Sequence, residues 1–208
     1  GSVDDHSQSD RVLRAVLAQA VELGADVQMF TGLDLDLPPY HTGAVLPARA
    51  TGYVAAVRRA DAVVISSPGY HGTVSGLVKN ALDYLEELRE DERPYLDGRA
   101  VGLIAVARGW QAAVSTLSTL RQVAHALRGW PTPLGLAINS TATRFDQDGS
   151  TTDEAAAAVW KHVDGALTSL HAGLSRWQRL RSFISLRSFR RGGGLLSRVP
   201  VPWRKAKP

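Results

Sequence analysis

The 208-residue sequence has no cysteine, one methionine and no long apolar run. Without cysteine, disulfides, thiolate nucleophiles and cysteine-ligated zinc or iron–sulfur clusters are excluded. A membrane-spanning helix needs about 20 continuous apolar residues, and no stretch approaches that length. The first ten residues, GSVDDHSQSD, have neither the basic start nor the apolar stretch of a secretory signal. We therefore expect a soluble protein of the cytoplasm.

Acidic residues are missing from the C-terminal end. All 20 Asp and Glu residues lie at or before Asp164, whereas 10 of the 24 Lys and Arg residues lie in residues 176–208. The formal net charge of +4 thus comes from a basic tail that follows an acidic globular part. A nucleic-acid-binding core is not indicated. We expect a globular domain over residues 1–172 and a tail over residues 173–208.

The tail leaves two interpretations open. Trp177, Leu180, Phe183 and Ile184 would form the apolar stripe of an amphipathic helix whose arginines suit an anionic membrane surface or another acidic partner. A disordered basic extension without a dedicated partner is the alternative. If the tail has a partner, a lipid surface and nucleic acid are both open, and salt-dependent binding to lipid vesicles or to DNA would separate these two.

Amphipathic segments and short apolar runs alternate through the globular part. The spacing predicts helices at residues 9–23, 48–60, 75–90, 111–129 and 152–172. Short apolar runs predict strands at residues 25–30, 61–67, 99–107 and 133–139. Ser9 is expected as the N-cap of the first helix and Gly24 as its stop. This alternation predicts an α/β fold with a doubly wound parallel sheet and helices on both faces.

Three polar loops would follow strands at one edge of such a sheet. They are GSVDDHSQS at residues 1–9, SPGYHGTVS at residues 67–75 and ARGWQ at residues 107–111. In doubly wound sheets, ligands bind beyond the carboxyl ends of the strands, where the topology changes direction. We therefore expect a binding site where these loops meet.

The first two loops differ in chemistry. Ser2, Ser7 and Ser9 surround the start of a helix, where hydroxyls and unpaired backbone N–H groups suit an anion such as phosphate. Asp4 opposes an anion, and an ordinary helix cap fits the same residues. In SPGYHG, the glycines would let the backbone approach a flat ligand, with Tyr70 and His71 along its edge, although an ordinary strand-to-helix turn is the alternative.

Residues 60–84, ADAVVISSPGYHGTVSGLVKNALDY, carry a family resemblance. They resemble the signature of the NADPH-dependent FMN reductase family of flavodoxin-like quinone, azo and flavin reductases, an apolar strand followed by S-P-E-Y-H/N-G-S-x-P-G-x-L-K-N-A-L-D-W/Y. The matching residues are Pro68, Tyr70, His71, Gly72, Gly76, Lys79, Asn80, Ala81, Leu82, Asp83 and Tyr84. GSVDDHSQS is similar to the phosphate loop of the family, and the resemblance extends over about residues 1–172.

The resemblance implies a flavodoxin-like fold, a homodimer and a set of FMN-binding residues. Ser2, Ser7 and Ser9 would hold the FMN phosphate. The isoalloxazine ring and ribityl chain would be lined by Pro68, Gly69, Tyr70, His71 and Gly72, and the far side of the ring would be closed by Arg108, Gly109 and Trp110. The flavin would take a hydride at N5 from NADPH or NADH and pass electrons to free flavin, a quinone or an azo or nitro compound. No catalytic protein residue is implied.

The sequence departs from the family pattern at several positions. Asp4 replaces an arginine that would face the phosphate, Gly69 replaces a glutamate and Ser75 replaces a proline. ARGWQ stands where the family has a glycine-rich loop. The first strand of the family would precede Gly1, so the resemblance implies that this strand is missing from the sequence or that Gly1 and Ser2 are a cloning remnant that mimics the motif.

Two rival functions remain open. A flavodoxin-like module without flavin would act through its basic tail, and a flavin reductase component would instead deliver reduced FMN to a monooxygenase. A metal site is not expected, because the six histidines show no metal-ligand spacing. The acidic residues between Glu86 and Glu92 are expected to form a solvated helix face.

Overall fold

A computed structural model describes residues 2, 4 and 7–146 of the chain. The helix expected at residues 152–172, the boundary expected between residues 172 and 173 and the basic tail lie outside the described residues.

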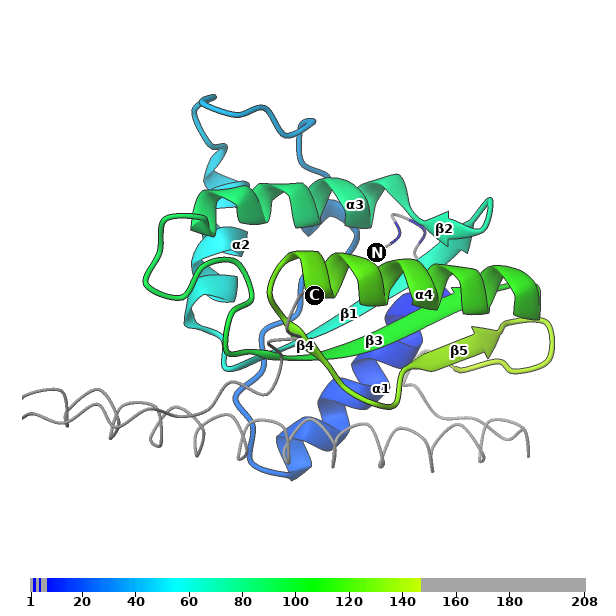
Figure 1. Cartoon of the computed structure of the whole chain (residues 1–208). Coiled ribbons are helices and arrows are strands. Elements are labelled where there is room, and N and C mark those ends of the chain that lie inside the picture. The colour runs from blue at the N-terminus through cyan, green and yellow to red at the C-terminus, as the bar shows by residue number, and fades with distance from the viewer. Residues whose placement is uncertain (1, 3, 5–6, 147–208) are drawn as a thin grey trace, which may run out of the picture. The chain divides into compact units, whose positions relative to one another are not determined.

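The described chain contains α-helices, two 3₁₀ helices and short strands (Figure 1). The helices are α1 (Gln8–Glu22), η1 (Gly32–Asp34), α2 (Ala48–Arg59), α3 (Gly76–Asp83), η2 (Tyr84–Leu88) and α4 (Trp110–Ala126). The strands are β1 (Ala62–Tyr70), β2 (Thr73–Val74), β3 (Ala100–Ala107), β4 (Trp130–Pro131) and β5 (Leu136–Asn139).

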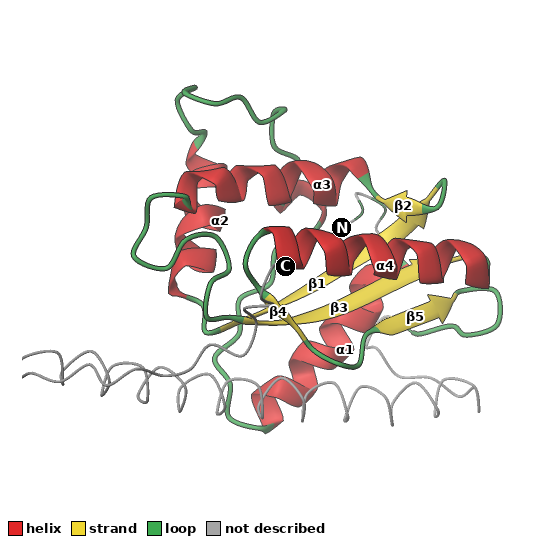
Figure 2. Cartoon of the chain, in the orientation of Figure 1, coloured by secondary structure: helices red, strands yellow, loops and turns green. Residues whose placement is uncertain are grey.

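The strands form a mixed sheet in the order β2-β1-β3-β4, with β5 also paired to β3. β1 and β3 run parallel over residues 62–68 and 100–106, and β4 and β5 are parallel to β3 as well. Among the described strands, only β2 is antiparallel, because it folds back on the end of β1 in a hairpin. The α/β prediction is confirmed, and Figure 2 shows helices on both sides of the strands.

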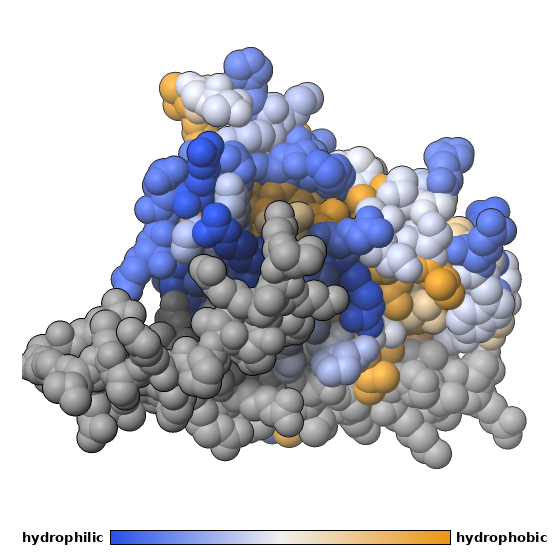
Figure 3. Space-filling view, viewed as in Figure 1, coloured by the Kyte–Doolittle hydropathy of each residue, from blue (hydrophilic) through white to orange (hydrophobic). Residues whose placement is uncertain are grey.

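Two apolar clusters cover the two faces of this sheet. Val12 and Val16 of α1 pack with Ile104 of β3 and Ile138 of β5 on one face. Residues from α2, α3 and α4 pack with β1 and β3 on the other face. All eight residues of β3 are buried, as a central parallel strand requires. In the space-filling view, hydrophobic residues reach the surface between α3 and α4 (Figure 3).

The prediction of a strand at residues 25–30 is wrong. These residues belong to no sheet, and Phe30 packs edge-on against Tyr53 of α2, with ring centroids 5.5 Å apart. An apolar segment becomes a strand only where a neighbouring strand pairs with its N–H and C=O groups. None of the described strands pairs with residues 25–30, so these residues form no strand despite their β propensity.

Most described helices lie where the spacing of apolar residues predicts them, although several begin or end at other residues than predicted. The N-cap of α1 is Ser7 and not Ser9, whereas Gly24 ends the helix in the left-handed region at φ +87° as expected. The helix expected at residues 75–90 tightens into η2 after Asp83, as final turns often do. Among the described helices, none is both long and apolar enough to cross a membrane.

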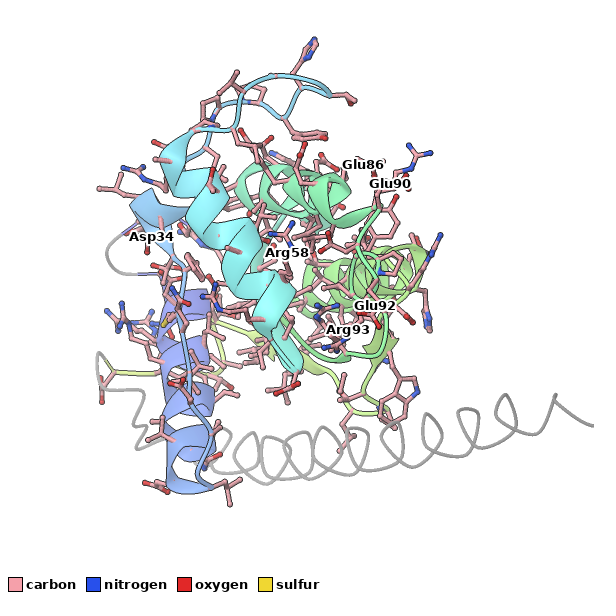
Figure 4. All side chains as sticks on the ribbon, turned by 90° about the vertical axis from the view of Figure 1, so that its left-hand side faces the viewer. Asp34, Arg58, Glu86, Glu90, Glu92 and Arg93 are labelled. Carbon is pink, nitrogen blue, oxygen red and sulfur yellow. The ribbon has the colours of Figure 1, made fainter. Side chains whose placement is uncertain are left out.

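Several acidic residues of η2 and the following loop form ion pairs with arginines. Arg58 Nε lies 2.7 Å from Asp91 Oδ2, and Arg89 lies within 3.5 Å of Glu86. Figure 4 shows Glu86, Glu90 and Glu92 on the same side of the molecule as Arg58 and Arg93. The acidic run is a surface network on this side, as the sequence predicted, and no binding site follows from it.

A buried arginine connects α2 to the start of β3. Arg99 is 1% exposed, and its guanidinium donates to the carbonyl oxygens of Arg58 (2.8 Å), Ala60 (3.0 Å), Tyr95 (3.1 Å) and Asp97 (3.3 Å). Burial lowers the pKa of this guanidinium. Two of the acceptors lie at the C-terminal end of α2, where the helix dipole also favours a positive charge.

Replacing Arg99 should destabilise the fold strongly. We expect Arg99→Met to lower the free energy of unfolding by about 3 kcal/mol, because buried carbonyls lose their donors. Arg99→Lys should lose less, since it keeps the charge. The exposed Arg89→Met serves as the control and should change stability by less than about 0.5 kcal/mol. Urea unfolding measures all three, and equal midpoints for the two methionine variants would contradict the role of Arg99.

Candidate functional site

The fold brings the predicted site residues together at one end of the sheet. β1 and β3 end side by side because they pair in parallel, with Pro68 opposite Val106. The hairpin therefore follows β1 at the level where the connection to α4 follows β3. The start of α1 lies at the same end, because the Ser66 hydroxyl of β1 donates to the carbonyl oxygen of Ser9 (2.8 Å). The sequence predicted this convergence of three loops.

Serine side chains line the start of α1. Ser7 Oγ and Ser9 Oγ share a hydrogen bond of 2.7 Å, and both residues are buried. Ser2 is also buried, and its hydroxyl accepts from the backbone N–H of Asp4 at 3.1 Å. Ser7 is the N-cap residue, yet its side chain makes no capping hydrogen bond in the described structure. The Ser7 hydroxyl therefore bonds to Ser9 Oγ and does not cap α1.

The bend at residues 68–72 is a β-hairpin. β1 continues through Pro68 to Tyr70, and Tyr70 pairs with Thr73 across a two-residue turn. The turn residues are His71 at φ +52° and Gly72 at φ +81°, as a type I′ turn requires. The expected strand end at residue 67 is therefore too early. Tyr70 and His71 are both exposed at the tip.

Gly69 lies where the hairpin touches α4. A Cβ atom on Gly69 would stand 2.6 Å from Thr116 Oγ1 and 3.1 Å from the Cβ atom of Ala107. Real Cβ atoms do not approach other atoms at the first distance, so a side chain at position 69 would require Thr116 or α4 to shift. Glycine, which has no Cβ, fits this close contact between the hairpin and α4.

The connection from β3 to α4 is held by a loop that the sequence reasoning did not include. Thr141 Oγ1 donates to the carbonyl oxygen of Arg108 (3.1 Å), and Ser140 N donates to that of Ala107 (2.8 Å). Gly109 is the N-cap of α4, and Trp110 is its first residue. Arg108, Gly109 and Trp110 are exposed, with the Trp110 side chain 57% exposed.

A second unpredicted contact fixes the end of the described chain against α1. Gln8 Nε2 donates to the carbonyl oxygen of Phe145 (3.2 Å), and Phe145 N donates to Gln8 Oε1 (2.9 Å). Arg11 Nη1 donates to the same carbonyl at 2.7 Å. These partners are 134 or more residues apart, so no local pattern could have shown them.

The polar residues of the segment KNALDY have structural roles. Asn80 Nδ2 donates to the carbonyl oxygens of Leu37 and Pro38 (both 3.0 Å), and its Oδ1 accepts from Tyr40 N (2.9 Å). The Tyr84 hydroxyl also donates to the Pro38 carbonyl (2.9 Å). Burial, together with a hydrogen bond to Glu87, raises the pKa of Tyr40. These residues fasten the 37–40 loop to α3 and do not line the three-loop site.

Ser75 takes the position of the proline in the resembling sequences. It is the N-cap of α3, and its hydroxyl accepts from Val78 N at 3.3 Å. Its own N–H donates to Ser67 Oγ at 3.1 Å. Proline could not donate this bond, so serine fits a position that joins the hairpin to both β1 and α3.

No group of three or more His, Asp or Glu residues that could hold a metal ion occurs among the described residues.

A family model described as NADPH-dependent FMN reductase matches residues 1–143, more than half of the chain. The chain belongs to this family. The resemblance drawn from residues 60–84 is thereby confirmed. FMN-dependent NADPH-azoreductases of Staphylococcus aureus, strains USA300 and NCTC 8325 among them, are 34% identical over 91 residues. That match covers 44% of this chain and 45% of theirs, so it spans under half the length of these relatives.

Solved structures of oxidoreductases have a similar fold to this FMN reductase family member. FerB, a flavoenzyme NAD(P)H:(acceptor) oxidoreductase from Paracoccus denitrificans, superposes with a TM-score of 0.66 at 21% identity, over 82% of this chain and 93% of that one. The apo form of the NADH:FMN oxidoreductase EmoB gives 0.60 at 21% identity, over 82% and 86% of the two chains. At these identities, the likeness shows the fold.

The packing at Gly69 gives a direct prediction. Gly69→Ala should lower the free energy of unfolding by about 1–3 kcal/mol, because the new methyl group overlaps Thr116 Oγ1. Thr116→Ala alone should cost less, since its hydroxyl is buried without a partner in the described structure. The double variant should recover stability relative to Gly69→Ala. Urea unfolding of the four proteins forms a double-mutant cycle, and strictly additive changes would contradict the proposed overlap.

Proposed function

We propose that this protein is an FMN-dependent NAD(P)H oxidoreductase whose electron acceptor is a small molecule: free flavin, a quinone, or an azo or nitro compound. One observation supports this most strongly. The chain belongs to the NADPH-dependent FMN reductase family. Beyond the carboxyl ends of β1 and β3, three segments meet: the serine-lined start of α1, the β1–β2 hairpin and the start of α4. Ligands of open α/β sheets bind at such edges.

The start of α1 has the donors that the FMN phosphate needs. Ser7 and Ser9 share a single hydrogen bond, so one hydroxyl proton of the pair is left for a ligand. The first turn of a 15-residue helix adds N–H groups and the positive end of its dipole. On this basis we propose that Ser2, Ser7 and Ser9 bind the FMN phosphate. Asp4 opposes the anion and weakens the site.

The hairpin and the β3–α4 connection suit a flat ring. We assign Pro68, Gly69, Tyr70, His71 and Gly72 to one side of the isoalloxazine ring and Arg108, Gly109 and Trp110 to the other. The type I′ turn and the contact with α4 hold the hairpin backbone in one shape, which orients a ring without ordering a flexible loop. When bound, FMN supplies the two-electron chemistry between NAD(P)H and the acceptor. The chain binds and orients the participants.

The finer assignments follow the family resemblance. We propose a doubly wound flavodoxin-like sheet in the complete fold, a homodimer, and action in the cytoplasm. The basic residues 176–208 keep their two interpretations, as a membrane-binding amphipathic helix or as a disordered extension. Size-exclusion chromatography with light-scattering detection would measure the molar mass of the protein and thus its oligomeric state.

Flavin titration tests the proposed function. We expect the purified protein to quench FMN fluorescence on binding, and the bound flavin bands to bleach under anaerobic NADPH or NADH. The double variant Ser7→Ala, Ser9→Ala should raise the Kd for FMN at least about tenfold, because a charge-assisted hydrogen bond is lost. Ser118→Ala, on the exposed face of α4, is the matched control and should bind as the wild type does.

The outcomes separate the rival functions. A folded protein that holds no flavin at saturating FMN would refute the reductase and favour the flavin-free module, for which Asp4 is the supporting observation. Bleaching followed by rapid transfer to free FMN supports an independent reductase. Transfer that requires an added monooxygenase supports the component that delivers reduced FMN.

A further inference from the structure

The segment that follows β5 contacts two of the three loops of the proposed site. It comprises residues 139–145, and we call it the strap. Near its first end, Thr141 Oγ1 donates to the carbonyl oxygen of Arg108 in the β3–α4 connection (3.1 Å). At its second end, the backbone of Phe145 is bonded to the side chain of Gln8 at the start of α1 (2.9 and 3.2 Å). One short segment therefore joins the loop proposed for the ring to the loop proposed for the phosphate.

Hydrogen bonds give the first part of the strap a fixed shape. Ser140 N donates to the carbonyl oxygen of Ala107 (2.8 Å), which extends the pairing of β5 with β3, and Thr143 N closes a turn on the carbonyl oxygen of Asn139 (2.9 Å). Asn139 is buried, and its Oδ1 lies 3.0 Å from Thr141 N and 2.6 Å from Thr141 Oγ1. The position of the Thr141 hydroxyl is thus set by β5 itself.

The core anchors the second end of the strap. Phe145 is 1% exposed and packs with Val12 of α1 and Ile138 of β5. Its carbonyl oxygen accepts from Gln8 Nε2 and from Arg11 Nη1 (2.7 Å), and its N–H donates to Gln8 Oε1. Both backbone groups of this buried residue are therefore bonded to side chains of the first turn of α1, which fixes that turn relative to β5.

Each contact holds a loop without belonging to the proposed flavin-binding set. Gln8 lies between Ser7 and Ser9 in the sequence, so its bonds to the strap determine where the two serine hydroxyls are held. Thr141 holds the peptide that joins Arg108 to Gly109. A site whose loops are already held in the binding geometry loses less entropy when the ligand binds.

We propose that Gln8 and Thr141 are positioning residues through which the strap fixes the two parts of the flavin site separately. Gln8 positions the phosphate loop, and Thr141 positions the β3–α4 connection beside the ring. The inference rests on the proposed function. The hydroxyl of Thr141 and both amide atoms of Gln8 already bond to protein atoms, so they act on the ligand through the loops that they hold.

The test compares FMN with riboflavin, which has the same ring and ribityl chain but no phosphate. Quenching of flavin fluorescence measures the Kd of both ligands for the 208-residue chain. We expect Gln8→Met to raise the Kd for FMN about fivefold and that for riboflavin less than about twofold, because only the phosphate donors are displaced. Thr141→Val should raise both Kd values by the same factor, about three- to fivefold, because both ligands carry the ring.

Two matched variants serve as controls. Thr51→Val removes another exposed hydroxyl that donates to a backbone carbonyl, that of Pro47 in α2 (3.2 Å). Gln122→Met alters an exposed glutamine of α4. Both controls should bind FMN and riboflavin as the wild type does. Thermal unfolding shows that each variant is folded, and the ratio of the two Kd values is a readout that a general loss of stability would not change.

The outcomes separate this inference from the proposed function. If the wild type binds neither flavin, the proposed function fails and the inference fails with it. If the wild type binds both flavins and Gln8→Met leaves the ratio of the two Kd values unchanged, the inference alone is refuted. Unchanged Kd values in Thr141→Val, or a loss of FMN binding alone in that variant, would also overturn the separate positioning of the two loops.

Discussion

The parallel pairing of β1 with β3 is the constraint on which the rest of the described structure depends. The pairing runs without a break from Ala62 opposite Ala100 to Pro68 opposite Val106. Because the strands point the same way and end at the same level, the segments that follow them begin side by side. The burial of all of β3 makes this pairing obligatory, since its backbone groups have no water to bind. Arg99 fixes the other end, where α2 and β3 meet.

The contact between the hairpin and α4 sets how closely the two loops approach. Gly69 removes the side chain that would separate them, and the turn at His71 and Gly72 reverses the chain within two residues. Tyr70 on the hairpin and Trp110 at the start of α4 are both exposed.

The family signature serves two purposes in one segment. Its first half forms the hairpin at the proposed flavin site, and its second half, through Asn80 and Tyr84, holds the 37–40 loop. A sequence match over such a segment therefore reports both the turn of the proposed site and the helix that follows it. On the other side of the sheet, Gln8 and Arg11 couple the start of α1 to Phe145, so the proposed phosphate site is supported from the chain that follows β5.

By itself, the sequence determined the class of fold, the positions of β3, α2 and α1 within a few residues, and the set of loops that meet at one edge. Each of these follows from local periodicity or from the rule that parallel strands end together. The tertiary structure alone decided that residues 25–30 form no strand, that β1 runs on through Pro68 into a hairpin, and that Gln8 contacts Phe145. These outcomes depend on which segments lie next to each other, and pairing between distant segments leaves no trace in local spacing.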